Sequence, residues 1–162
     1  MRDTILFFAA LLLSLTAGRS FWVTLGENPF DMSGRTYVEF FQQLDRKIAG
    51  PIAVTAMGGT LLAGIAAFAH RRQRVPFLLL AAACALGVVA SVVTVTINVP
   101  VNKMLATWDP AALPAGYEDH LRRWWTWHQV RFAAMLIATC AVYLAMLIRD
   151  PSRGPHAQPE RR

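Results

Sequence analysis

Apolar residues form long runs along this chain, separated by shorter segments that hold most of the charged residues. The runs cover residues 5–25, 51–69, 76–99 and 130–148. Each is close to the ~20 residues that a helix needs to cross the hydrocarbon core of a bilayer. None shows the alternation of apolar and polar positions that a membrane-spanning strand requires. The pattern therefore predicts an all-α protein, a four-transmembrane-helix bundle forming one domain over residues 1–150.

The composition agrees with a membrane protein, since 55% of the residues are hydrophobic and only 16% are charged. The formal net charge of +6 does not indicate a nucleic-acid partner, because the basic residues are spread over loops and ends and do not alternate with aromatic residues on one soluble face. Residues 151–162 are rich in Pro, Gly and Arg. We predict that they form a disordered tail.

The distribution of basic residues predicts the topology. Arg71, Arg72 and Arg74 lie in the short second loop, and further arginines precede the first run and follow the last one. Under the positive-inside rule these segments are cytoplasmic. We therefore expect a multi-pass protein of the cell membrane with both termini in the cytoplasm. A cleaved signal peptide ending near Gly18 is the alternative for the first run, but hydrophobicity resumes directly after it, which favours a retained helix.

The first outer loop contains an amphipathic segment. Over residues 35–48 apolar side chains recur at helical spacing, and charged or amide side chains fill the other positions. Asp31 or Ser33 is suited to cap its start. The sequence leaves two arrangements open: a helix lying on the membrane surface, or a helix that runs directly into the second span past Gly50-Pro51.

Polar residues interrupt the end of the third run. Asn98 and Asn102 are four residues apart and share a face if the helix continues. Pro100 between them removes a backbone donor, so it kinks or ends the helix and releases carbonyl groups. The two asparagines could bind a ligand or pin neighbouring helices, or they could form a polar helix stop bonded to its own backbone.

A second polar cluster opens the fourth run. We expect this helix to begin near Tyr117, and Trp124, His128 and Arg131 then fall on one stripe at i, i+4 and i+7. Arg131 needs a partner inside the apolar run, and we expect Asp45 or the carbonyls freed by Pro100 to provide it. Trp127 falls on another face, which is typical of an interfacial aromatic belt.

His128 is the best candidate for an acid or a base, because imidazole titrates near neutrality. A histidine that merely forms a hydrogen bond at the interface is the alternative. No metal site is predicted, since His120, the only other histidine at that end, lies on a different part of the helix surface. Arg19, near the outer end of the first span, is compatible with snorkelling to the surface and with facing the same site.

Three of these segments together resemble the anthrone oxygenase-like family of small four-helix membrane proteins. They are Gln42-Gln-Leu-Asp45-Arg46, Asn98-Val-Pro-Val-Asn102 and Trp124-Trp-Thr-Trp127-His128-Gln-Val-Arg131. The resemblance extends to about residue 148. It points to the following site residues: Gln42, Asp45, Arg46, Asn98, Pro100, Asn102, Trp124, Trp127, His128 and Arg131. Asp45 and His128 stand where many members of the family have Asn.

The resemblance implies oxidation of an aromatic polyketide or hydroquinone-like substrate by O2, without a metal or flavin cofactor. In that scheme His128 is the base, and Arg131, Asn98 and Asn102 stabilise the oxyanion. Trp124 is the stacking wall for the flat ring, and the expected substrate-binding residues are Trp124, Trp127, Gln42, Asp45 and Arg46.

A second class of function stays open. A non-catalytic bundle could bind a lipid, a quinone or a partner protein through the same residues. The expected ligand is a small aromatic or lipid-like molecule in either case, with membrane lipids around the bundle. Small residues at Gly58, Gly59 and Gly64 allow close helix contacts within one protomer or in a homo-oligomer.

Overall fold

The structure, a computed structural model, describes residues 1–148, and every regular element among them is helical. The elements follow one another as α1 (Arg2–Gly26), α2 (Gly34–Ala69), α3 (Arg74–Val93), the π-helix η1 (Thr94–Asn98), α4 (Val99–Leu105) and α5 (Tyr117–Leu147). This confirms the predicted all-α fold and the start of the last helix at Tyr117. The predicted tail, residues 151–162, lies outside the described residues.

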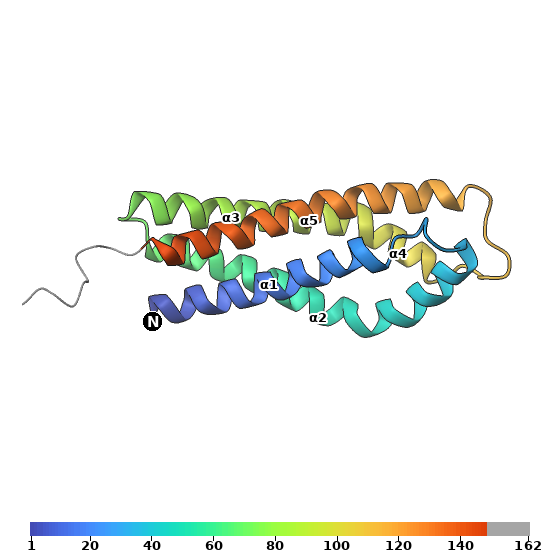
Figure 1. The fold of residues 1–162 in the computed structure, drawn as a ribbon, viewed down its shortest axis with the longest axis horizontal. Helices are drawn as coiled ribbons and strands as arrows, with labels where there is room; N and C mark the ends of the chain where they lie inside the picture. Colours follow the sequence, from blue (N-terminus) through green and yellow to red (C-terminus); the bar gives the residue numbers. More distant parts are fainter. Residues whose placement is uncertain (149–162) are drawn as a thin grey trace, which may run out of the picture.

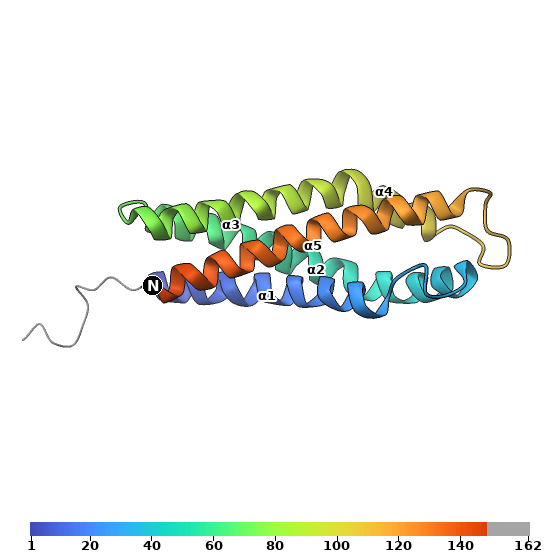
Figure 2. The ribbon, with the colours of Figure 1, turned by 45° about the horizontal axis from the view of Figure 1, so that its top comes forward.

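The long helices run up and down as one bundle (Figure 1). Helix α1 packs on α2 and α5, and α3 packs on α2 and α5 as well, so that the helices form a closed ring. The start of α1, the loop between α2 and α3 and the end of α5 lie at one end, here named the terminal end (Figure 2). The connections 27–33 and 106–116 lie at the opposite end, here named the loop end.

The bundle has the dimensions and surface of a multi-pass membrane protein. Within residues 1–148, four helical stretches are long and apolar enough to cross a bilayer: Arg2–Gly26, Gly34–Ala69, Arg74–Leu105 and Tyr117–Leu147. Only 28% to 39% of the most apolar window of each stretch is buried inside the protein. Large side chains such as Leu61, Val95 and Leu144 instead point outward. An apolar exterior of this kind is stable only against lipid.

The amphipathic segment of the first loop is not a separate helix. It forms the first half of α2, which begins at the cap residue Ser33, whose hydroxyl accepts the backbone N–H of Thr36. The helix continues through Pro51 to Ala69, so the second of the two predicted arrangements is present. Helix α2 changes direction in its middle (Figure 1). Pro51 explains the bend, because its ring clashes with the preceding turn and its backbone nitrogen has no hydrogen to donate.

The third span also continues past its proline. After α3 the chain widens into η1, where the N–H of Val99 bonds to the carbonyl of Thr94, five residues back. Pro100 then occupies the start of α4, where an N–H is least needed. The sequence predicted a kink or a stop. The chain stays helical but bends between α3 and α4 (Figure 1), and at the bend it forms a π-helical turn, a feature often found at functional sites.

Two apolar clusters fill the interior of the bundle. The larger one lies toward the terminal end and includes Leu13, Leu80 and Val142. The smaller one lies toward the loop end and includes Tyr37, Leu105 and Leu121. Between them, each of three helical stretches contributes polar residues to the interior.

Candidate functional site

The polar residues between the two apolar clusters form one layer across the bundle, here named the polar layer. It consists of residues from α1, from the third span and from α5: Arg19, Ser20, Thr24, Thr94, Asn98, His128 and Arg131. Arg131 lies 16 residues before Leu147, the last residue of α5. That separation corresponds to ~24 Å of helix. For a hydrocarbon core ~30 Å thick that begins at Leu147, the layer would lie near the loop-end boundary.

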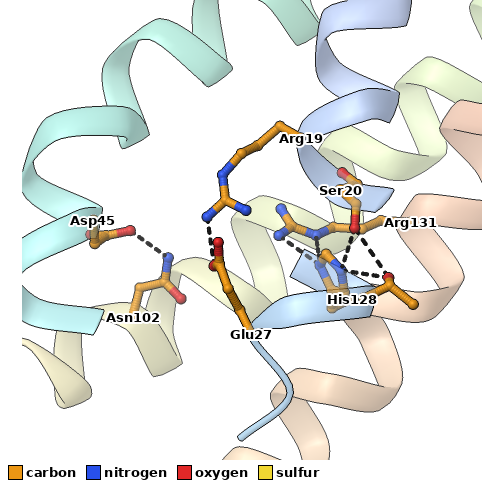
Figure 3. Close-up of polar contacts among 8 residues, drawn as sticks. Arg19, Ser20, Glu27, Asp45, Asn102, His128 and Arg131 are labelled. Atoms are coloured by element: carbon orange, nitrogen blue, oxygen red, sulfur yellow. Dashed lines mark hydrogen bonds and ion pairs between the residues drawn. The ribbon is translucent and has the colours of Figure 1, made fainter. Parts of the chain in front are cut away.

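The centre of the polar layer is a contact between Arg131 and His128 (Figure 3). Nε and Nη2 of Arg131 both approach Nδ1 of His128, at 3.3 and 3.1 Å. A guanidinium only donates, so Nδ1 must be the acceptor and the proton of the neutral imidazole lies on Nε2. Nε2 faces the carbonyl oxygen of Ser20 at 3.3 Å and the hydroxyl of Thr24 at 3.4 Å. Both ring nitrogens of this fully buried histidine are therefore engaged.

Arg131 has no carboxylate partner among the described residues. Its remaining hydrogen bond goes from Nη1 to the hydroxyl of Thr94, at 3.4 Å. Our expectation that Asp45 or the carbonyls near Pro100 would pair with it was wrong, because the π-helical turn presents Thr94 to it instead. An interior guanidinium held only by neutral acceptors retains an uncompensated charge.

Aromatic rings cover His128. The indole of Trp124 lies parallel to the imidazole, with ring centroids 5.2 Å apart and an interplanar angle of 5°. The indole of Trp125 stacks on the same imidazole, with a centroid distance of 5.6 Å. Trp124 is buried, so in this arrangement it shields the histidine and does not present a free face to a ligand.

The two asparagines of the third span connect helices. Asn98 donates from Nδ2 to the carbonyl oxygen of Trp124 at 3.1 Å, and Asn102 accepts the indole N–H of Trp124 at 2.7 Å. Asn102 also donates to Asp45 of α2 at 3.3 Å (Figure 3). The chain Asp45–Asn102–Trp124–Asn98 thus joins α2, α4 and α5. Oδ1 of Asn98 is buried and has no donor partner among the described residues.

The other predicted site residues lie at the margin of the polar layer or outside it. Gln42 donates from Nε2 to the carbonyl oxygens of Leu105 and Trp108, both at 2.9 Å, which fixes the end of α4 against α2. Arg46 is exposed and bonds only to the carbonyl of Gln42. Trp127 is 37% exposed and faces away from the bundle, as expected for an interfacial residue. The predicted ligand-contacting roles of these residues stay predictions.

The sequence alone left Arg19 between two roles and did not reveal several other residues near the site. In the structure Arg19 is an ion-pair partner: Nη2 lies 2.7 Å from Oε2 of Glu27, and the two side chains are 20% and 10% exposed. Tyr37 of α2 is 2% exposed. A signal for Glu27 was present, since it is the first acidic residue after the first apolar run. Thr94 and Ser20 carry no such signal, because their roles depend on helix packing.

The described residues contain no group of three or more His, Cys, Asp or Glu side chains arranged to hold a metal ion. Cys84 and Cys140 are free thiols, the first half-buried among apolar residues and the second exposed on the apolar exterior. The polar groups at the site are mainly guanidinium, imidazole and amide groups, which donate and accept hydrogen bonds.

These features define a polytopic helical membrane protein with a buried polar layer toward the loop end of the bundle. The family model for anthrone oxygenase matches residues 40–141, which is most of the chain. The chain belongs to the anthrone oxygenase family, and this confirms the resemblance found in its motifs. No curated protein and no solved structure matches it significantly. Arg19, Glu27 and Tyr37 lie before the matched residues.

Proposed function

We infer that the protein oxidises an anthrone-type substrate, a flat aromatic ketone with an acidic methylene group, with O2. One oxygen atom becomes the new quinone carbonyl, and the other leaves as water with the two methylene hydrogens. Family membership supports this reaction class. The single observation that carries the proposal is the buried pair in which Arg131 donates to Nδ1 of His128.

The pair supplies the two functions that enolisation requires. Arg131 turns from His128 to the ketone oxygen of the substrate and stabilises the negative charge that develops there. Nδ1 of His128, released by that movement, then accepts a proton from the methylene carbon. The apolar clusters above and below exclude water, so the fixed guanidinium stabilises the enolate more strongly than it would in solution.

The enolate carbon then transfers electrons to O2 and forms a C–O bond. Loss of the second proton from that carbon and cleavage of the O–O bond give the quinone and water. The electrons come from the substrate and O2 is the oxidant, so this route requires no metal or flavin. Asn98 and Asn102 position Trp124 and the third span, and Trp124 holds the imidazole of His128 in its plane.

The test is anthrone oxidation by the purified protein in detergent, followed by O2 uptake and by the absorbance of the anthraquinone. We expect His128→Ala to lower kcat by about 10²–10⁴-fold and Arg131→Ala by about 10²–10³-fold. Matched controls are His120→Ala and Arg123→Ala, because both residues are exposed on the same helix. The proposal is wrong if correctly folded His128 and Arg131 variants oxidise anthrone as fast as the parent.

A second candidate function is binding of a lipid or quinone without turnover. One observation favours it: His128 is fully buried and both of its ring nitrogens are engaged, as expected for a purely structural histidine. The same assay separates the two functions, since a binder leaves anthrone oxidation at the rate of protein-free detergent. An absorption spectrum and a metal analysis of the same preparation test the expectation that no cofactor is bound.

A further inference from the structure

Arg19 has a free donor inside the site. Its Nη2 is paired with Glu27, but Nη1 is buried and has no protein acceptor among the described residues. A buried charged donor without an acceptor is costly in a folded protein. In the view of Figure 3 the guanidinium of Arg19 lies between the Asp45–Asn102 contact and the Arg131–His128 contact. Arg19 directly precedes Ser20, whose carbonyl oxygen faces Nε2 of His128, so the turn of α1 that holds the free donor also contacts the proposed catalytic pair.

Tyr37 provides a second free donor. It is 2% exposed, and its hydroxyl makes no hydrogen bond within the part of the chain that the structure describes. It packs in the apolar cluster at the loop end with Trp124, and Trp124 stacks on His128 of the polar layer. A phenol in such surroundings is available to donate to an oxygen atom of a ligand.

The charges of the site favour an anionic ligand. Of its two arginines, Arg19 is in an ion pair, whereas Arg131 has only neutral acceptors. Asp45 does not compensate Arg131, because its carboxylate accepts from Asn102 and lies beyond ion-pair distance of either arginine. Free guanidinium and phenol donors around an unpaired positive charge match a carboxylate, which only accepts hydrogen bonds.

We propose that Arg19 and Tyr37 bind a carboxylate group of the aromatic ligand, so that the protein selects ring systems that carry an acidic substituent. This rests on the proposed function in one respect, namely that the ligand occupies the polar layer. Arg19, Tyr37 and Glu27 all precede the residues that match the family model. In this proposal they select the ligand, while the Arg131–His128 pair performs the chemistry.

Glu27 affects how tightly Arg19 binds a carboxylate. Its carboxylate occupies one edge of the Arg19 guanidinium at 2.7 Å and repels a second carboxylate on the other edge. Its own position is defined, because it ends α1 and its backbone N–H bonds to the carbonyl of Val23. Glu27 therefore holds Arg19 in place and at the same time weakens the binding of an anion.

The test compares two three-ring probes that are not oxidised in this reaction, anthracene-9-carboxylate and its neutral analogue 9-anthracenemethanol. Binding is measured without O2, by quenching of tryptophan fluorescence in an uncharged detergent, with empty micelles as the blank. We expect the parent to bind the carboxylate at least ~10-fold more tightly than the alcohol. Arg19→Gln and Tyr37→Phe should each remove most of that preference without weakening the alcohol. Arg35→Gln, an exposed arginine of the same end that pairs with Glu39, should leave both affinities unchanged.

The Glu27→Gln variant should change the affinity for the carboxylate in the opposite direction. It should tighten binding of the carboxylate and leave the alcohol unaffected, because it removes the repulsion but keeps a side chain of the same size. A purely structural Arg19–Glu27 pair would give no gain in affinity. Equal affinities of the parent for the two probes, or a preference that survives both Arg19→Gln and Tyr37→Phe, overturn the proposal. A parent that oxidises anthrone but shows no preference refutes only this selection; a preference without oxidation refutes only the proposed reaction.

Discussion

Arg131 carries a full charge into the bundle and makes its contacts with an imidazole nitrogen and a hydroxyl group. This arrangement has two consequences. It determines which nitrogen of His128 accepts, since a guanidinium cannot. It also leaves the guanidinium without a carboxylate, so that an oxyanion is its most favourable partner. One pair of side chains thus combines an imidazole nitrogen that accepts hydrogen bonds with a guanidinium that lacks a carboxylate partner.

Trp124 supports this pair in two separable ways, by stacking on His128 and by donating its indole N–H to Asn102 at 2.7 Å. Trp124→Phe keeps a ring but removes the donor. We expect it to lower the free energy of unfolding by about 1 kcal/mol, the usual net value of one hydrogen bond.

Thermal or denaturant unfolding in detergent measures this change. Trp127→Phe is the matched control, because Trp127 is partly exposed on the same helix, and it should change stability by less than about 0.5 kcal/mol. Equal effects of the two substitutions would show that the Trp124–Asn102 bond does not contribute to stability.

At the scale of elements, close contacts between helices bring the polar layer together. Gly87 of α3 packs directly against the side chain of Thr60 on α2, and a Cβ at residue 87 would overlap that side chain. Thr60 cannot easily turn away, because its hydroxyl donates to the carbonyl of Ala56 at 2.8 Å. The distance between α2 and α3 is therefore limited by this one position.

Gly87→Ala should for this reason destabilise the protein by about 1–3 kcal/mol, the usual cost of overpacking. Gly18→Ala is the control, since an added Cβ at residue 18 meets nothing within 4 Å. It should stabilise α1 by up to about 1 kcal/mol through higher helix propensity. Unfolding temperatures measured in the same detergent compare the two variants. If Gly87→Ala is as stable as the parent, the helix contact is looser than the structure indicates.

The two prolines show how elements depend on their context. Pro51 and Pro100 both suggested interruptions, yet the chain remains helical through each. Neighbouring helices stabilise these segments, and at Pro100 a π-helical turn redistributes the backbone hydrogen bonds. That turn brings Thr94 to Arg131, a contact that no sequence pattern predicted.

At the scale of the whole molecule, the start of α1, the arginine-containing loop after α2 and the end of α5 all lie at one end of the bundle. The positive-inside rule predicts that this end faces the cytoplasm. On that prediction the polar layer lies toward the outer side of the membrane, and a ligand would enter from the outer leaflet or from the outer aqueous side.

Labelling of single cysteines in intact cells tests this orientation. In a background in which Cys84 and Cys140 are replaced by Ala, a cysteine at Ala111 should react with a membrane-impermeant maleimide. A cysteine at Arg72 should react only after the cells are opened. The reverse pattern would place the polar layer at the cytoplasmic boundary and contradict the predicted topology.

The sequence by itself determined the architecture, because a span must be apolar over about twenty residues and this requirement is local. The spans, the start of α5 at Tyr117 and the family could all be recognised in this way. Part of the site could be predicted too, since Trp124, His128 and Arg131 share a helical stripe and one helix brings them together.

Only the tertiary structure decided what these side chains contact. The partners of Arg131, His128 and Asn102 come from other helices, and their choice depends on helix rotation and spacing, which glycines such as Gly87 limit. The tertiary structure also pairs Arg19 with Glu27 and buries Tyr37 beside the polar layer. A polar side chain in a membrane must find a partner, but the packing of the helices decides which one it finds.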